Sequence, residues 1–262
     1  MSADVSRLDL RLRRRMLLGT ALGTAAYLLV VVAIYPSFKH DATLNALVMA
    51  NPSAAAAFGV TGSITTPAGW LNANMYANFG PLLALLLTIG YGSAAIAGQD
   101  ADGMLGLLAT QPLSRARILA EKLGALLVCS AVVPAVSYVV CLAGPRFGLV
   151  PGWGALVGVT IAMAVLAFDL GALALLVGAL TGSRGTALGV ASGLAAATYL
   201  VSSLAAVNDT VHRIRWLSPF YWSVGNGQLE GGVSVADLAS LAGLGTVLSV
   251  ACVVAFRRLD IH

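Results

Sequence analysis

Charged side chains are scarce in this sequence of 262 residues, because only 10% are Asp, Glu, Lys or Arg. Soluble domains usually carry about 25%. Eleven acidic and fifteen basic residues are too few to cover a water-soluble fold that is 58% hydrophobic. This scarcity excludes a soluble enzyme and a disordered chain. The net charge of +4 is also too thinly spread for a nucleic-acid-binding surface.

Cysteine is equally scarce, and its placement excludes a disulfide framework. The three cysteines, Cys129, Cys141 and Cys252, all lie in apolar runs. Cys129 and Cys141 are about 18 Å apart along one helix, which is too far for a bridge. No histidine spacing is typical of a zinc site. We therefore expect buried free thiols and no metal.

Long apolar runs are what the sequence has in abundance. A bilayer core of about 30 Å needs roughly 20 apolar residues per helix, and none of the runs alternates as a barrel strand would. The sequence predicts an all-α integral membrane protein with one domain over residues 1–262. Its six transmembrane helices are expected at residues 16–35, 81–98, 123–144, 153–181, 186–207 and 238–256.

Glycines inside these runs are expected to allow close contact between helices. They are Gly19, Gly23, Gly90, Gly171, Gly189 and Gly193.

The basic residues between the spans predict the orientation in the membrane. With the N-terminus inside, eleven lie on the cytoplasmic side and four outside. The excess favours a multi-pass protein of the cell membrane with both termini in the cytoplasm. The first span could also be a signal peptide, but its length and the lack of a cleavage site favour an uncleaved anchor.

Three segments are expected to lie at the membrane surface. In residues 1–15 the apolar side chains of Val5, Leu8 and Leu12 share one face, which predicts an amphipathic interfacial helix; the alternative is a frayed basic tail. The outer loop at residues 208–235 is expected to form short broken helices, re-entrant or anchored by aromatic side chains. The aromatic segment from Trp70 to Phe79 is expected at the outer interface.

The cytoplasmic connection at residues 99–122 carries the most distinctive pattern. Asp100 and Asp102 open a short helix with a leucine-rich side, Pro112 stops it, and Ser114 can cap the next helix. A short transverse helix can dock on a soluble partner, whereas an ordinary loop would only set the topology. The residues expected to make this contact are Asp100, Asp102, Gly103, Leu107, Leu108, Pro112, Ser114, Arg115 and Lys122.

These residues resemble the signature loop of type-2 ATP-binding-cassette (ABC-2) permeases. The family's form has a Glu-rich start, a Gly-Thr-Leu, a leucine run, a Pro-Val-Ser-Arg and a trailing Lys. Gln99 stands where Glu is common, and Met104 replaces the Thr. Further likeness comes from Leu217-Ser218-Pro219-Phe220 and from the terminal Phe256-Arg257-Arg258-Leu259-Asp260.

The resemblance implies the membrane half of an exporter, working as a dimer of six-helix subunits. It also implies two cytoplasmic ATPase subunits that bind ATP and Mg and contact the N-terminal helix and the 99–122 loop. The other permease would be a second copy or a related chain. A lipophilic drug, an antibiotic or a lipid-like molecule would suit the apolar spans.

The chain itself lacks the motifs of an ATPase or a hydrolase. Its only lysines, Lys39 and Lys122, do not follow a phosphate-binding glycine pattern. It has no Gly-x-Ser-x-Gly and no His-Glu-x-x-His. We therefore expect a non-catalytic subunit without a cofactor of its own.

Asp169 is the one charged residue inside the predicted spans. An intramembrane carboxylate costs at least about 2.5–3.5 kcal/mol, and a functional role is the default hypothesis. It could contact a substrate or a cation, or form a structural hydrogen bond with Ser137, Tyr138, Thr198 or Tyr199. Two other functions stay open: a proton- or cation-coupled secondary carrier that uses Asp169, and a membrane assembly subunit that transports nothing.

Overall fold

A computed structural model describes residues 4–51, 55, 63–99, 114–205, 208–225 and 227–257. Six helical segments in this part of the chain are long and apolar enough to cross a bilayer, and no strand occurs in it. The all-α membrane fold with six transmembrane helices is therefore confirmed. The spans run over Val5–Phe38, Pro67–Gly98, Ala116–Cys141, Trp153–Thr181, Arg184–Leu204 and Val235–Phe256.

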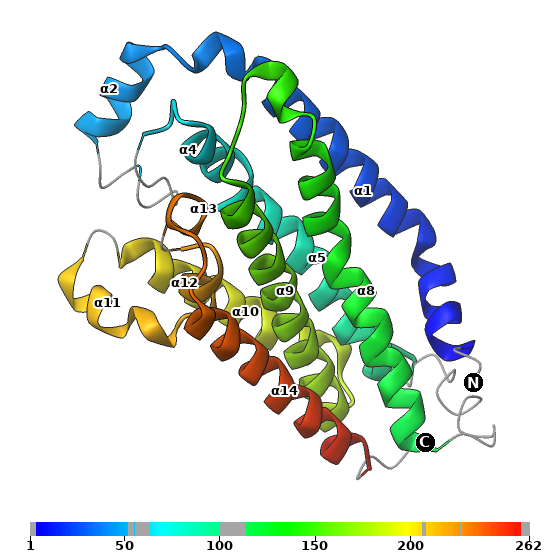
Figure 1. The fold of residues 1–262 in the computed structure, drawn as a ribbon. Coiled ribbons are helices and arrows are strands. Elements are labelled where there is room, and N and C mark those ends of the chain that lie inside the picture. The colour runs from blue at the N-terminus through cyan, green and yellow to red at the C-terminus, as the bar shows by residue number, and fades with distance from the viewer. Residues whose placement is uncertain are drawn as a thin grey trace.

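The central element of the bundle is α9 (Trp153–Thr181), which has no polar face and only one charged residue, Asp169. It packs against α5 (Phe79–Ser93), α8 (Arg115–Cys141), α10 (Arg184–Leu204) and α14 (Val235–Arg257). The first helix, α1 (Asp4–Phe38), lies at the edge of the bundle along α8 (Figure 1). A helix without a polar face belongs in the interior, which explains the position of α9.

Close packing between α5 and α9 depends on a pair of glycines. A Cβ atom added to Gly92 would overlap the backbone carbonyl of Gly171, and one added to Gly171 would lie 2.6 Å from Leu126 and 2.9 Å from Thr88. Of the six glycines expected at helix contacts, only Gly171 makes one among the described residues. At the other five an added Cβ meets nothing within 4 Å.

The N-terminal segment differs from the expected interfacial helix. From Asp4 the basic residues form the beginning of α1 itself, because no Gly or Pro interrupts the helix before Gly19. Leu8 and Leu12 of the expected apolar face are exposed, while Asp9 is buried on the side facing the bundle. The expected boundary at residue 16, between an interfacial helix and the first span, is therefore absent.

The second span begins earlier than predicted, through α4 (Pro67–Leu71) and the π-helical turn η1 (Asn72–Tyr76). Trp70 and Tyr76 are buried rather than resting at the membrane surface. The indole nitrogen of Trp70 donates to the carbonyl of Val31 in α1 at 3.0 Å. A second π-helical turn, η2 (Ala94–Gly98), ends the span.

The ends of the bundle carry different kinds of structure (Figure 1). The start of α1 and the end of α14 lie at one end. The other end holds α2 (Ala42–Ala50) and the short helices of the 208–235 loop. As expected, that loop is broken into α11 (Asp209–Ile214), η4 (Arg215–Leu217), α12 (Pro219–Ser223) and α13 (Gln228–Gly231). The turn η3 (Gly144–Phe147) joins α8 to α9.

Candidate functional site

Most of the residues expected to contact an ATPase fall outside the described part of the chain. These are Asp100, Asp102, Gly103, Leu107, Leu108 and Pro112. Ser114 is the N-cap of α8, as predicted, since its hydroxyl oxygen accepts from the backbone N–H of Arg117 at 3.3 Å. Arg115 is the first residue of that helix. The segment from Arg115 to Lys122, expected within the connecting loop, is therefore helical.

Lys122 does not extend toward a partner, which corrects its expected role in docking. Its side chain is fully buried. The ammonium nitrogen donates to the side-chain oxygen of Gln99 at 2.5 Å and lies 3.5 Å from a carboxylate oxygen of Asp9. The buried acid is the physical reason, because a lysine is rarely buried without a charged or polar partner.

Asp9 is the centre of this buried group, which we call the Asp9 cluster: Asp9, Tyr91, Gln99 and Lys122. Its carboxylate accepts from the hydroxyl of Tyr91 at 2.8 Å and from the amide nitrogen of Gln99 at 2.9 Å. The Tyr91 hydroxyl also lies 3.1 Å from the backbone carbonyl of Lys122. The cluster thereby joins α1, α5, the residue after η2, and α8.

A second contact holds the beginning of α1 against α8. The carboxylate of Glu121 accepts from the backbone N–H groups of Val5 and Ser6 at 2.8 and 3.3 Å. Negative charge at a helix N-terminus is favourable because it satisfies free N–H groups and the helix dipole. Gln99, which binds Asp9 of α1, directly precedes residues 100–113. The helix α8, whose Glu121 and Lys122 contact α1, begins directly after Ser114. Both ends of that connection are therefore held against α1.

Sequence reasoning missed Asp9, although one signal was available. Asp9 is the one acidic residue among the five arginines from Arg7 to Arg15. Its partners lie 82 to 113 residues away in the chain. Pairing over such a distance does not follow from local patterns.

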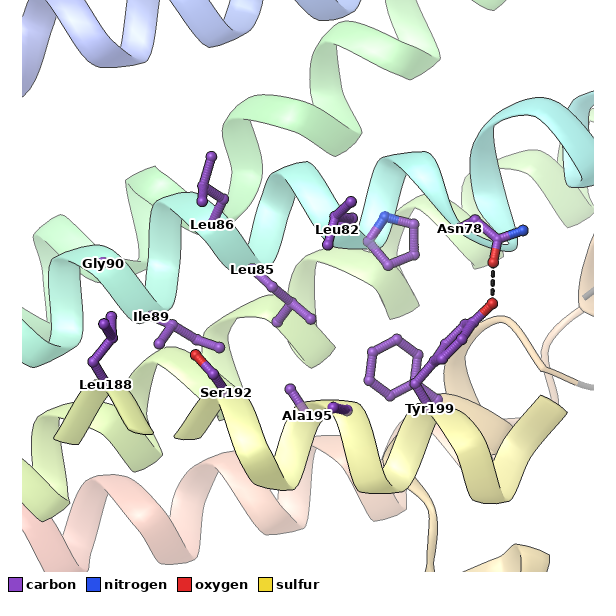
Figure 2. A pocket seen from close by; sticks show the side chains of 13 residues that line it. Asn78, Leu82, Leu85, Leu86, Ile89, Gly90, Leu188, Ser192, Ala195 and Tyr199 are labelled. Atoms are coloured by element: carbon purple, nitrogen blue, oxygen red, sulfur yellow. Dashed lines mark hydrogen bonds between the residues drawn. The ribbon is translucent and has the colours of Figure 1, made fainter. Parts of the chain in front are cut away.

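An apolar hollow of about 490 Å³ lies between α5 and α10 (Figure 2). Leucine and isoleucine side chains of α5 face small residues of α10 across it, and the hydroxyl of Tyr199 is hydrogen-bonded to the side-chain oxygen of Asn78 at one end. Its lining residues are Asn78, Pro81, Leu82, Leu85, Leu86, Ile89, Gly90, Leu188, Ser192, Ala195, Ala196, Tyr199 and Phe220.

The hollow opens at the surface of the bundle. Leu82 and Leu86 line it and are each 66% exposed. Leu82 and Leu86 are four residues apart on α5, which is also the spacing of side chains that face lipid. The sequence alone therefore does not distinguish the lining of this hollow from an ordinary lipid-facing surface. Its chemistry suits an apolar molecule or the apolar surface of another chain.

Asp169 lies on α9 at the side facing α14, and it is 1% exposed. Neither carboxylate oxygen has a hydrogen-bond partner among the described residues. Three of the four expected partners are engaged elsewhere: Ser137 donates to the carbonyl of Val133, Thr198 to that of Leu194, and Tyr199 to the side chain of Asn78. The structural hydrogen bond expected for Asp169 is therefore not seen.

A search among curated proteins gives no match. The family model described as ABC-2 family transporter protein matches residues 3–261, which is nearly the entire chain. Together with the six membrane spans, this match shows that the chain belongs to the ABC-2 transporter family and is a multi-pass membrane component of a transport system.

Proposed function

We propose that this chain is the permease subunit of an ATP-driven exporter, forming the translocation pathway as a dimer powered by separate ATPase subunits. Membership of the ABC-2 family supports the transport role. The observation that carries the proposal is the apolar hollow between α5 and α10. It provides a place where a substrate can contact the permease.

The lining of the hollow favours a lipophilic drug, an antibiotic or a lipid-like substrate. Its volume of about 490 Å³ lies within the range of about 300–1,000 Å³ that is typical of ligand sites. Asn78, Ser192 and Tyr199 are its polar side chains, and the Asn78–Tyr199 hydrogen bond consumes part of their capacity. Affinity would then come mainly from buried apolar surface.

The exposed edge of the hollow supports a second permease as its other wall. Leu82 and Leu86 would lose their contact with lipid when a second copy or a homologous permease packs against α5 and α10. Two facing hollows would then enclose a path between the subunits.

Energy would reach this path through the connection at residues 99–122. Two ATPase subunits would bind ATP and Mg, and the leucine-rich segment with Leu107 and Leu108 would dock on them. A rigid attachment is needed because a loose loop would absorb the motion. The Asp9 cluster supplies such an attachment, since it ties both ends of the connection to α1.

The proposed location is the cell membrane with both termini in the cytoplasm. The start of α1 and the end of α14 lie at the same end of the bundle, which supports a common side (Figure 1). Membrane-impermeant thiol labelling from outside is expected to reach Thr210→Cys and to miss Gly103→Cys. Labelling of Gly103→Cys from outside contradicts this orientation.

Transport in reconstituted vesicles tests the function. We expect the permease and its ATPase, purified together, to move rhodamine only when ATP is present. Ala196→Trp fills the hollow from an exposed position on α10, so it should reduce transport severalfold. The matched control is Ala197→Trp, at the next exposed position and outside the hollow. Equal transport in both variants contradicts the role of the hollow.

The same vesicles separate the two alternative functions. A secondary carrier is favoured by the buried carboxylate of Asp169, and it would move substrate along a proton or cation gradient without ATPase or ATP. A membrane assembly subunit would move nothing under either condition.

A further inference from the structure

A second hollow, of about 320 Å³, lies between α9 and α14, away from the α5–α10 hollow. Asp169 is one of its lining residues, together with Phe168 on α9 and Gly245, Thr246 and Ser249 on α14. Its volume falls at the lower end of the range typical of ligand sites, about 300–1,000 Å³. We call it the Asp169 hollow.

The carboxylate of Asp169 is buried without a donor. It is 1% exposed, and both oxygens lack a hydrogen-bond partner in the described part of the chain. The spans of α9 and α14 contain no basic residue except Arg257 at the end of α14, about 18 Å along the helix from Gly245. A buried acid of this kind is costly unless a donor arrives from elsewhere.

The α14 side of the hollow leaves space for the carboxylate and presents only hydrogen-bond acceptors to it. A Cβ atom at Gly245 would overlap the Oδ1 atom of Asp169. The hydroxyl groups of Thr246 and Ser249 donate to the backbone carbonyls of Ala242 and Gly245, each at 2.7 Å. Their protons are therefore used within α14, and what they present to the hollow is oxygen lone pairs.

This set of groups selects the chemistry of a ligand. A carboxylate and two hydroxyl oxygens call for N–H donors that carry positive charge, because charge-assisted hydrogen bonds are the strong ones. The remaining walls are apolar, and the aromatic ring of Phe168 is also favourable to a cation. The volume is too large for a bare ion and suits an ammonium group on a compact apolar body.

The depth of the hollow distinguishes between sources of the ammonium group. Asp169 lies about 24 Å from Trp153 and about 18 Å from Thr181 along α9, near the middle of the span. Lipid headgroups lie at the bilayer surface, so an aminophospholipid cannot present its amine at this depth. The ligand must dissolve in the membrane.

We propose that the Asp169 hollow binds the primary or secondary ammonium group of a small membrane-permeant organic amine, with Asp169 accepting its N–H donors. The proposal concerns binding to the permease itself. It does not require the amine to be exported, and it stands or falls separately from the coupling to an ATPase.

Direct binding of radiolabelled adamantylamine to the full-length chain in phosphatidylcholine nanodiscs tests the proposal. We expect saturable binding to the parent protein and a loss of affinity of at least about tenfold in Asp169→Asn, the usual effect of removing a charge-assisted hydrogen bond. Asn keeps the size of the side chain and removes a buried charge, so folding is preserved. Gly245→Ala should also weaken binding because it displaces the carboxylate.

Three comparisons make the result decisive. Gly243→Ala is the matched control on α14, since an added Cβ there meets nothing within 4 Å, and it should bind like the parent. Adamantanol, which is uncharged, and trimethyladamantylammonium, which has no N–H, should compete poorly. Equal affinity in Asp169→Asn, or equal competition by either analogue, overturns the proposal. Displacement by phosphatidylethanolamine in the nanodiscs overturns the choice of a free amine.

Discussion

Asp9 and Asp169 are both buried carboxylates of this bundle, and their surroundings are opposite. Asp9 is 3% exposed and receives hydrogen bonds from Tyr91 and Gln99 beside the ammonium group of Lys122. Asp169 is 1% exposed and has no donor in the described residues. One lies near the end of the bundle where α1 begins, and the other lies near the middle of α9.

The difference shows how burial of charge can serve structure in one place and binding in another. Asp9 gathers partners from three separate parts of the chain, so it fixes the positions of helices relative to each other. Asp169 holds no other helix in place within the described part of the chain, so its two carboxylate oxygens remain available to accept hydrogen bonds from a ligand. The following predictions test this contrast, beginning with the largest effect.

Removing the cation beside Asp9 should destabilise the protein strongly. Lys122→Met leaves a buried carboxylate without its charged partner, which costs about 3–5 kcal/mol. Thermal unfolding in detergent should show a large fall in Tm. The double variant Asp9→Asn with Lys122→Met should recover much of the loss, because the charge itself is gone. A similar Tm for the parent and the single variant contradicts the structural role of the cluster.

Disturbing the close contact of α9 with α5 should have an intermediate effect. Gly171→Ala brings a methyl group against Leu126 and Thr88, and overpacking of this kind costs about 1–3 kcal/mol. The matched control is Gly154→Ala, on the same helix in open space. A lower Tm in the first variant alone would show that α9, and with it Asp169, is held firmly in place.

Neutralising Asp169 should have the smallest effect on folding. Asp169→Asn removes a buried carboxylate that has no donor among the described residues, so no stabilising contact is lost and we expect stability without ligand to be kept or raised. Side-by-side thermal unfolding with Asp9→Asn makes the comparison direct. A large loss of stability in Asp169→Asn contradicts the distinction between the two acids.

The sequence predicts the membrane architecture well, for a physical reason. The run from Trp153 to Thr181 matches α9 from end to end, because it is apolar apart from Asp169 and two threonines, and Gly182 ends it in the left-handed conformation with φ +63°. Ser114 is likewise recognisable as a helix cap before α8. Hydrophobic length and capping are local properties, and both can be read from neighbouring residues.

The polar contacts could not be predicted, because they join residues distant in the chain. Lys122 has the spacing of a docking residue but is buried beside Asp9 on another helix. Trp70 has the composition of a membrane-surface segment but donates to the backbone of Val31. The hollow beside Leu82 depends on how α5 and α10 are placed relative to each other. Asp169 was recognisable alone because a charge inside an apolar span is conspicuous.

The most direct test of the central claim is ATP-driven transport by the permease–ATPase complex with the leucines of the 99–122 connection altered. Leu107→Asp with Leu108→Asp should abolish transport, by loss of ATPase co-purification or by hydrolysis without transport, because buried apolar side chains usually anchor such an interface. The control is Val235→Asp, an exposed position at the other end of the bundle. We predict normal transport in the control and none in the double variant. Normal co-purification and transport in the double variant would contradict the claim that this connection couples the permease to its ATPase.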